Sequence, residues 1–145
     1  MIRAVLDANV YASALIRPTG PCGRILRSFV EHRSFALLAS PSILDETERC
    51  LFYPKVRKRI ALSDAAIRQW LAAVAIMAEV VSDHLKLDVV SSDPDDNKVL
   101  AAAIEGHASH IVTGDTDLLE LKLYEGVTIL RPALFETLLS PQQPK

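Results

Sequence analysis

A short apolar run that ends in an acid, at residues 4–7, constrains the fold of this chain more than any other feature. Ala4, Val5 and Leu6 are followed directly by Asp7. An uninterrupted apolar run of this kind is typical of a parallel strand buried on both faces of a sheet. In open α/β folds the carboxyl ends of such strands border the ligand crevice, so we predict that Asp7 lies in a site rather than in the core.

Further apolar runs alternate with helical patterns along the rest of the chain. The predicted strands lie near residues 35–39, 79–81, 111–113 and 127–130, and the main predicted helices near residues 21–32, 42–52, 63–77, 98–106 and 132–139. Strands that alternate with helices favour βαβ units, in which a parallel sheet carries helices on both faces. The sequence therefore predicts an α/β fold in three layers.

Local signals predict where some of these helices begin and end. Ser42, with Asp45 three residues later, makes a capping-box pattern at the start of the helix that follows the second strand. Gly106 is expected to cap the end of a later helix. We expect one domain over residues 1–140 and a flexible C-terminal tail over residues 141–145.

Composition narrows the class of protein. Half of the 145 residues are hydrophobic, which is enough for a full core. The net charge is −2, so any contact with nucleic acid would have to use a local basic patch. The N-terminus lacks the pattern of a signal peptide and no apolar run has transmembrane length, so we expect a cytoplasmic protein that makes no use of a membrane.

Cysteine and histidine do not suggest a zinc or redox site. Cys22 and Cys50 form no CxxC pair, and the four histidines have no zinc-ligand spacing with each other or with cysteine. The two cysteines are therefore expected to be reduced thiols.

Acids stand at comparable structural positions along the predicted fold. Asp7 ends the first strand, Glu46 lies in the helix after the second, Asp96 begins the helix before the fourth, and Asp115 follows the fourth with Asp117 two residues later. Carboxylates that share one crevice repel each other, so they either hold protons or bind a cation. Oxygen ligands without histidine or cysteine favour Mg²⁺ or Mn²⁺ over zinc, and such a site supports phosphodiester hydrolysis.

Most of these acids also have an ordinary structural explanation. Asp96 and Asn97 fit a helix N-terminus, Asp115 and Asp117 fit a turn, and Glu46 alone fits a solvated helix face. The functional interpretation depends on the joint pattern, and on Asp7, which stands between apolar residues.

Four stretches of the chain closely resemble PIN-domain proteins. They are residues 5–10, 42–46, 93–103 and 111–119, in that order. The resemblance covers nearly the whole chain, and within the family the chain looks most like toxins of bacterial toxin–antitoxin pairs, related to VapC. It implies a Rossmann-like α/β/α fold whose central parallel sheet has five strands in the order 3-2-1-4-5.

The same resemblance implies an activity and a set of partners. A protein of this branch is expected to be a ribonuclease that depends on Mg²⁺ or Mn²⁺. RNA would be its substrate, a cognate antitoxin its partner, and a homodimer or higher homo-oligomer its assembly.

The resemblance also implies roles for particular residues. Carried over, the catalytic and metal-binding acids are Asp7, Glu46, Asp96 and Asp115, with Asp117 as an accessory metal ligand. Asp95 and Asp96 both align with the family position, and we choose Asp96. Hydrogen-bonding support for the ligands is expected from Asn9, Asn97 and Thr113.

Basic residues offer possible contacts to RNA phosphates, which bind by charge without reading sequence. The only dense basic run contains Lys55, Arg57, Lys58 and Arg59, and Arg17 and Arg24 lie near the loop after the first predicted strand. A solvated helix face explains the basic run equally well.

Three other functions compete with a ribonuclease. A haloacid-dehalogenase-like phosphotransfer enzyme typically has a second acid two residues after the first, where this chain has Asn9. A receiver domain would place a phosphoacceptor acid on the third strand, which offers only Asp83 just beyond its end. A PIN fold that binds RNA or a protein partner without cutting stays open.

Overall fold

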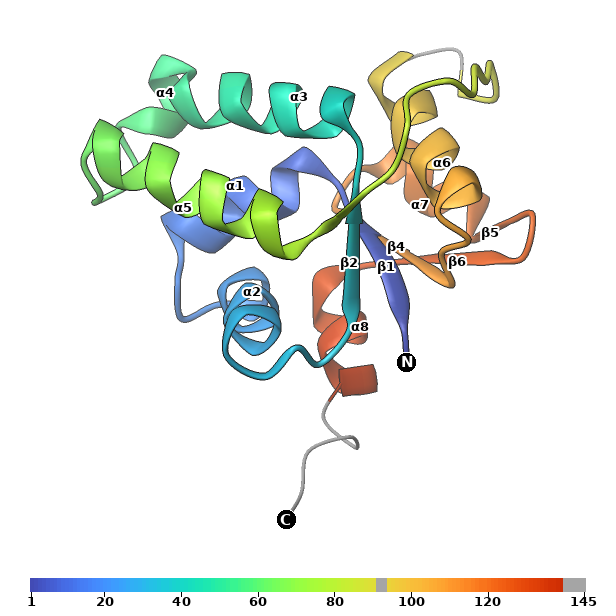
Figure 1. The fold of residues 1–145 in the computed structure, drawn as a ribbon, viewed down its shortest axis with the longest axis horizontal. Helices are drawn as coiled ribbons and strands as arrows, with labels where there is room; N and C mark the ends of the chain where they lie inside the picture. The colour runs from blue at the N-terminus through green and yellow to red at the C-terminus, as the bar shows by residue number, and fades with distance from the viewer. Residues whose placement is uncertain (91–93, 140–145) are drawn as a thin grey trace.

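A twisted sheet forms the centre of the molecule in the computed structural model, which describes residues 1–90 and 94–139 (Figure 1). Within those residues the sheet has six strands: β1 Arg3–Leu6, β2 Ala36–Ala39, β3 Glu79–Val80, β4 His110–Val112, β5 Leu123–Tyr124 and β6 Val127–Leu130. The helices are α1 Ala8–Ile16, α2 Pro21–His32, α3 Pro41–Phe52, α4 Pro54–Arg57, α5 Asp64–Met77, α6 Pro94–Glu105, α7 Thr116–Leu121 and α8 Pro132–Leu139. The predicted tail at 141–145 lies outside the described residues.

The strand order is β3-β2-β1-β4-β6-β5, so the predicted order 3-2-1-4-5 is confirmed for the five parallel strands. The prediction of five strands was wrong by one, because β5 adds an antiparallel edge strand beside β6. Glu125 and Gly126 form the turn between them, with φ of 49° and 81°. Positive φ at both residues is typical of a two-residue hairpin turn, in which glycine is favoured.

The core surrounds β1, whose residues Ala4, Val5 and Leu6 are fully buried. Helices α1, α2 and α8 contribute to this core from one side of the sheet and α6 from the other (Figure 1). A second apolar cluster joins α1 to α3 and α5 through Leu15, Leu51 and Ile67. Among the described residues, no helix combines the length and apolarity needed to span a membrane.

The start of α3 differs from the predicted capping box. Ser40, not Ser42, is the N-cap, because its hydroxyl accepts a hydrogen bond from the Ile43 N–H at 3.2 Å. Pro41 occupies the first helical position, where its missing N–H costs nothing. Helix α3 therefore begins directly at the carboxyl end of β2.

Gly106 directly follows α6, at the predicted cap position, and its N–H donates to the Ala102 carbonyl oxygen at 2.9 Å. The residue with left-handed backbone after α6 is His107, at φ 53°. At Gly106 a Cβ atom would lie 2.8 Å from Leu38 Cδ1 and 3.2 Å from the Ala102 carbonyl oxygen. Glycine is therefore needed here for close packing of α6 against β2 rather than for a turn.

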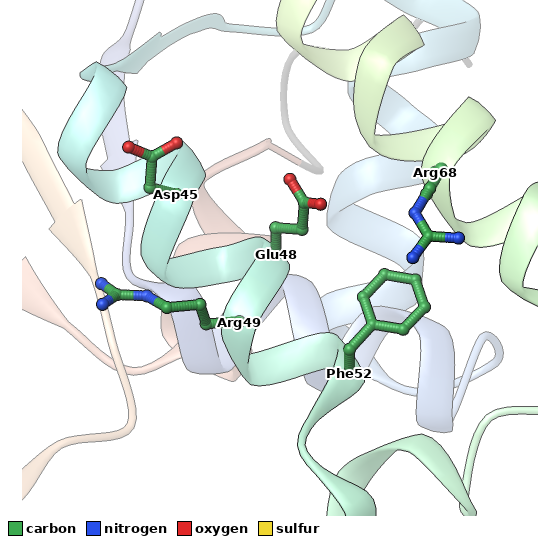
Figure 2. Close-up of a pocket in the computed structure, with 5 residues that line it drawn as sticks. All are labelled: Asp45, Glu48, Arg49, Phe52 and Arg68. Carbon is green, nitrogen blue, oxygen red and sulfur yellow. The ribbon is translucent and has the colours of Figure 1, made fainter.

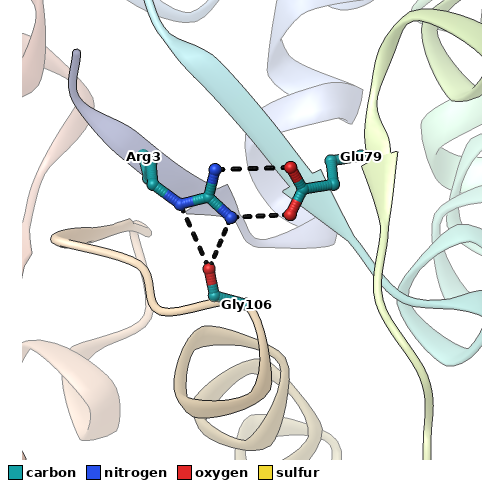
Figure 3. A network of polar contacts seen from close by, with 3 residues as sticks. All are labelled: Arg3, Glu79 and Gly106. Carbon is teal, nitrogen blue, oxygen red and sulfur yellow. Dashed lines mark hydrogen bonds and ion pairs between the residues drawn. The ribbon is translucent and has the colours of Figure 1, made fainter.

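An arginine joins three elements at the amino end of the sheet (Figure 3). Arg3 donates two hydrogen bonds to the carboxylate of Glu79, at 2.6 and 3.3 Å, and two to the Gly106 carbonyl oxygen, at 2.7 and 3.2 Å. The hydrogen bond from Arg3 lowers the pKa of Glu79. This contact joins β1, β3 and the end of α6 at the end of the sheet opposite Asp7.

Gly23→Ala should destabilise the protein. A Cβ atom at Gly23 would lie 2.1 Å from the Pro18 carbonyl oxygen, so the turn before α2 must move. We expect a loss of about 1–3 kcal/mol in the free energy of unfolding, although glycine-to-alanine changes inside helices usually stabilise by up to about 1 kcal/mol. Urea unfolding measures the difference. Arg27→Ala, at an exposed position of α2, is the matched control, and equal stability of Gly23→Ala and wild type would contradict this packing.

His110 should make the fold less stable in mild acid. Its ring is half-buried at the start of β4, 6.0 Å from the Phe135 ring, and burial lowers its pKa below the ordinary 6.5. Below about pH 6.5 the unfolded chain takes up a proton that the folded chain refuses. The contribution of the neutral His110 ring to the free energy of unfolding is thus complete above that pH. It is lost as the pH falls toward the pKa of His110 in the folded state. Urea unfolding at pH 7.5 and 5.5 should show a larger loss for wild type than for His110→Gln, and equal losses would contradict the assignment.

Candidate metal centre

Asp7 leaves the sheet at the carboxyl end of β1 and caps α1. Its Oδ1 accepts a hydrogen bond from the Ala8 N–H at 2.7 Å, and its Oδ2 accepts from Thr113 Oγ1 at 2.8 Å and from Asn9 Nδ2 at 3.2 Å. Asp7 is only 6% exposed. The structure therefore holds this carboxylate in one orientation at the sheet edge.

Thr113 connects the ends of β1 and β4. This fully buried residue donates to Asp7, and its Oγ1 accepts from the Asp115 N–H at 3.0 Å. Asp115 in turn caps α7, because its Oδ1 accepts from the Asp117 N–H at 2.8 Å. A continuous hydrogen-bonded path thus runs from Asp7 to Asp117.

Three carboxylates converge beside this path. One oxygen from each of Asp96, Asp115 and Asp117 lies within 4.8 Å of the other two. Asp96 is 3% exposed and comes from the first turn of α6, whereas Asp115 and Asp117 come from the start of α7. The structure therefore brings together three of the predicted site residues, which come from two separate helices.

The electrostatics of this cluster fit a divalent cation. Two full negative charges about 4.8 Å apart repel by roughly 3.5 kcal/mol at an effective dielectric of about 20. The positive ends of α6 and α7 offset part of this repulsion. An all-oxygen donor set suits the hard cations Mg²⁺ and Mn²⁺, so the residues present could hold such an ion.

Glu46 approaches the site from α3. It is half-buried, and Cys50 lies one helical turn later on the same face. Burial raises the pKa of the Cys50 thiol, and the charges of Glu46 and Asp7 raise it further. The Cys50 thiol is therefore within electrostatic range of both carboxylates. Cys50 is a free thiol, as the sequence predicted, and its spacing of four residues from Glu46 explains why the two side chains share a helix face.

Not every predicted site residue joins the three-carboxylate group. Among the residues that the structure describes, Asp7 and Glu46 fall outside it. Asp95 forms an ion pair with Lys98 at 3.3 Å instead of entering the cluster. Asn97 turns its amide to the backbone of the chain that leads into α6 rather than to a carboxylate.

The predicted RNA contacts divide into two kinds. Arg24 is paired with Glu136, and Arg57 donates to Asp64 at 2.6 Å, so both guanidinium groups already serve packing between helices. Lys55, Lys58, Arg59 and Arg17 are exposed cations for which no such ion pair to a helix is seen among the described residues, whereas Arg24 is exposed but paired.

A separate pocket of about 500 Å³ opens between α3 and α5 (Figure 2). The guanidinium of Arg68 lies over the Phe52 ring, 4.4 Å from its centroid. The lining residues on α3 are Asp45, Glu48, Arg49 and Phe52, which share a helix face that does not contain Glu46. With charges of both signs, this pocket is unlike the acidic centre.

Comparison with known proteins agrees with this architecture. A protein of Methanocaldococcus jannaschii, the uncharacterized protein MJ1680, is 36% identical over 121 residues, which cover 83% of this chain and 76% of that protein. The crystal structure of PAE2754 from Pyrobaculum aerophilum aligns with a TM-score of 0.64 at 19% identity, over 97% of this chain and 91% of that one.

A second solved structure shares the fold. It is VapBC2 from Rickettsia felis bound to a DNA fragment from their promoter, with a TM-score of 0.58 at 12% identity over 90% of this chain and 98% of that one. The family model that describes the PIN domain matches residues 3–117, a stretch that contains Asp7, Glu46 and the three clustered acids. This chain therefore belongs to the PIN-domain family.

Proposed function

We propose that the protein is an endoribonuclease that hydrolyses RNA phosphodiester bonds and depends on Mg²⁺ or Mn²⁺. The observation that carries this proposal is the approach of Asp96, Asp115 and Asp117 to within 4.8 Å beside the hydrogen-bonded Asp7. Membership of the PIN-domain family supports a hydrolase that acts on nucleic acid.

The residues of the site take distinct roles in this proposal. Asp96, Asp115 and Asp117 would hold the cation, which when bound supplies positive charge for phosphate oxygens. Asp7 and Glu46 add carboxylates at the same crevice, as further ligands and as acceptors for the proton of an attacking water. Thr113 orients Asp7.

Asn9 lies in the first turn of α1, beside Asp7. It is exposed, donates to Asp7, and accepts a hydrogen bond from the Gly114 N–H at 3.3 Å. It therefore connects the start of α1 to the loop after β4, and we assign it the task of keeping these two segments at a fixed separation.

RNA would reach this crevice along exposed cations. The candidates are Lys55, Lys58 and Arg59 at and after α4, and Arg17 after α1. Because such contacts are to phosphates, RNA affinity should fall as salt concentration rises. Arg24 and Arg57 are poorer candidates, since acidic neighbours already pair with them.

We further propose that the protein acts as the toxin of a toxin–antitoxin pair in the cytoplasm. An apolar groove of about 390 Å³ lies between α2 and α5 and exposes parts of Val30 and Leu62. A groove of this character suits the apolar face of a partner helix, which is how an antitoxin could bind. The protein is also expected to form a homodimer or a higher homo-oligomer, which light scattering would measure.

Induced expression in a bacterial host tests the toxin proposal. We expect growth to stop soon after induction, because a nuclease that cuts cellular RNA blocks translation. Asp115→Asn, produced at the same level, should allow normal growth. Equal arrest by both proteins would show that the acidic centre does not cause toxicity.

Cleavage of an end-labelled single-stranded RNA tests the nuclease itself. The purified protein should cut the RNA in Mn²⁺ or Mg²⁺ and should stop when EDTA is added. Mn²⁺ binding without any cutting would instead favour a PIN fold that binds RNA or a partner.

A further inference from the structure

Both polar atoms of the Asn97 side chain form hydrogen bonds with one backbone segment. Its Oδ1 accepts hydrogen bonds from the N–H groups of Val89 and Val90, both at 2.8 Å, and its Nδ2 donates to the Val90 carbonyl oxygen at 2.8 Å. The residue is 7% exposed. A buried amide with these three contacts fixes residues 89 and 90 against the first turns of α6.

The same segment is attached at other points. Glu105, near the end of α6, accepts hydrogen bonds from Ser82 and from the Leu85 N–H, the latter at 2.8 Å. Asp83 Oδ2 accepts from the Ser42 N–H at 3.0 Å, at the start of α3. Residues 82–90 are thus fastened both to α6 and to the helix that carries Glu46.

Asn97 directly follows Asp96 in the first turns of α6. The carboxylate of Asp96 stands close to those of Asp115 and Asp117, and like charges push it away when no cation is bound. A small rotation of this turn would relieve the repulsion, so something must hold the turn. The three hydrogen bonds of Asn97 tie this turn to the backbone of residues 89 and 90 and so oppose the rotation.

We infer that Asn97 is a positioning residue for the metal centre, which it serves by locking the start of α6 so that Asp96 faces Asp115 and Asp117 before a cation arrives. This inference rests on the proposed metal site. It assigns Asn97 a task that works through the backbone of residues 89 and 90, with no contact to the cation or to RNA. Groups that orient metal ligands typically alter metal affinity by about 10- to 100-fold when they are removed.

Titration with Mn²⁺, followed by the electron paramagnetic resonance signal of the free ion, tests this role. Asn97→Ala should bind Mn²⁺ about 10- to 100-fold more weakly than wild type. Glu105→Gln is the matched control, because it weakens an attachment of the same segment at the far end of α6. Its affinity should stay within about threefold of wild type, and Trp70 fluorescence verifies that both variants are folded.

Amide hydrogen exchange of the wild-type protein gives a second measurement that needs no variant at Asn97. Coupling between two sites is reciprocal, so if the contact of Asn97 with residues 89 and 90 strengthens cation binding, a bound cation strengthens that contact by the same free energy. Mg²⁺ should therefore slow exchange of the peptide that contains Val89 and Val90. Asp96→Asn should abolish this protection.

The outcomes separate this inference from the proposed function. The positioning role would be overturned if wild type and Asn97→Ala bound Mn²⁺ with equal affinity. It would also be overturned if Mg²⁺ did not change the exchange rates at Val89 and Val90. Either result would leave the metal site intact. A wild-type protein that binds no Mn²⁺ would overturn the metal site itself. If Asn97→Ala does not fold, the exchange experiment decides alone.

Discussion

Asp7→Asn should reduce metal-dependent RNA cleavage by about 10²-fold or more, the range found when one preorganised polar group is removed from an active site. The substitution removes one negative charge at the carboxyl end of β1 and keeps the size of the side chain. An asparagine oxygen can still accept the hydrogen bond from the Ala8 N–H, so the cap of α1 survives. Initial rates on a labelled single-stranded RNA, with equal amounts of protein, measure the loss.

Asp45→Asn is the control for this change. Asp45 is an exposed acid on α3 that lines the pocket of Figure 2, on a different helix face from Glu46. The rate of RNA cleavage by Asp45→Asn should equal that of wild type. Full activity of Asp7→Asn would show that cutting comes from another site or from a contaminating nuclease.

Mn²⁺ should stabilise the wild-type protein strongly, and Asp96→Asn should remove this effect. At a free concentration 100 times the Kd, binding to the folded state alone adds about 2.7 kcal/mol to the free energy of unfolding. For a chain of this size that corresponds to a rise in Tm of roughly 5–10 °C. Asp96 is the most buried of the three clustered acids, so its loss should abolish the rise.

The neighbouring acid supplies the control for the thermal measurement. Asp95→Asn changes an acid that pairs with Lys98, and it should keep the full Mn²⁺ response. A response lost in Asp95→Asn and kept in Asp96→Asn would reverse the assignment of the ligand. Scans should be run with EDTA, with Mn²⁺ and with Ca²⁺ so that general salt effects can be subtracted.

Much of the fold could be predicted from periodicity and local signals. The apolar run before Asp7 predicted a central buried strand, and β1 has this place between β2 and β4. Alternating strands and helices predicted the parallel order. The hairpin of β5 escaped because only two residues pair on that edge, and the Glu125–Gly126 turn was its single local signal.

The site was harder to predict at the level of single contacts. The sequence places Asp96 at a helix start and Asp115 and Asp117 in a turn after the fourth strand, but only the structure shows that these three carboxylates converge while Asp7 and Glu46 fall outside their group. The resemblance implied a supporting role for Asn97, but its partners could not be predicted, because they are backbone groups, which every residue possesses. The type of side chain shows that a hydrogen bond can form, but it does not show which group will be the partner.

The cation dependence of both cleavage and stability tests the central claim most directly. We would titrate Mn²⁺ into the wild-type protein, measure the initial rate of RNA cleavage at each concentration, and measure Tm on the same samples. If the acidic centre is the active site, both quantities rise with the same midpoint, and Asp115→Asn shows neither rise. Cleavage that persists in EDTA, or that saturates at a Mn²⁺ concentration far from the midpoint in Tm, would contradict the claim.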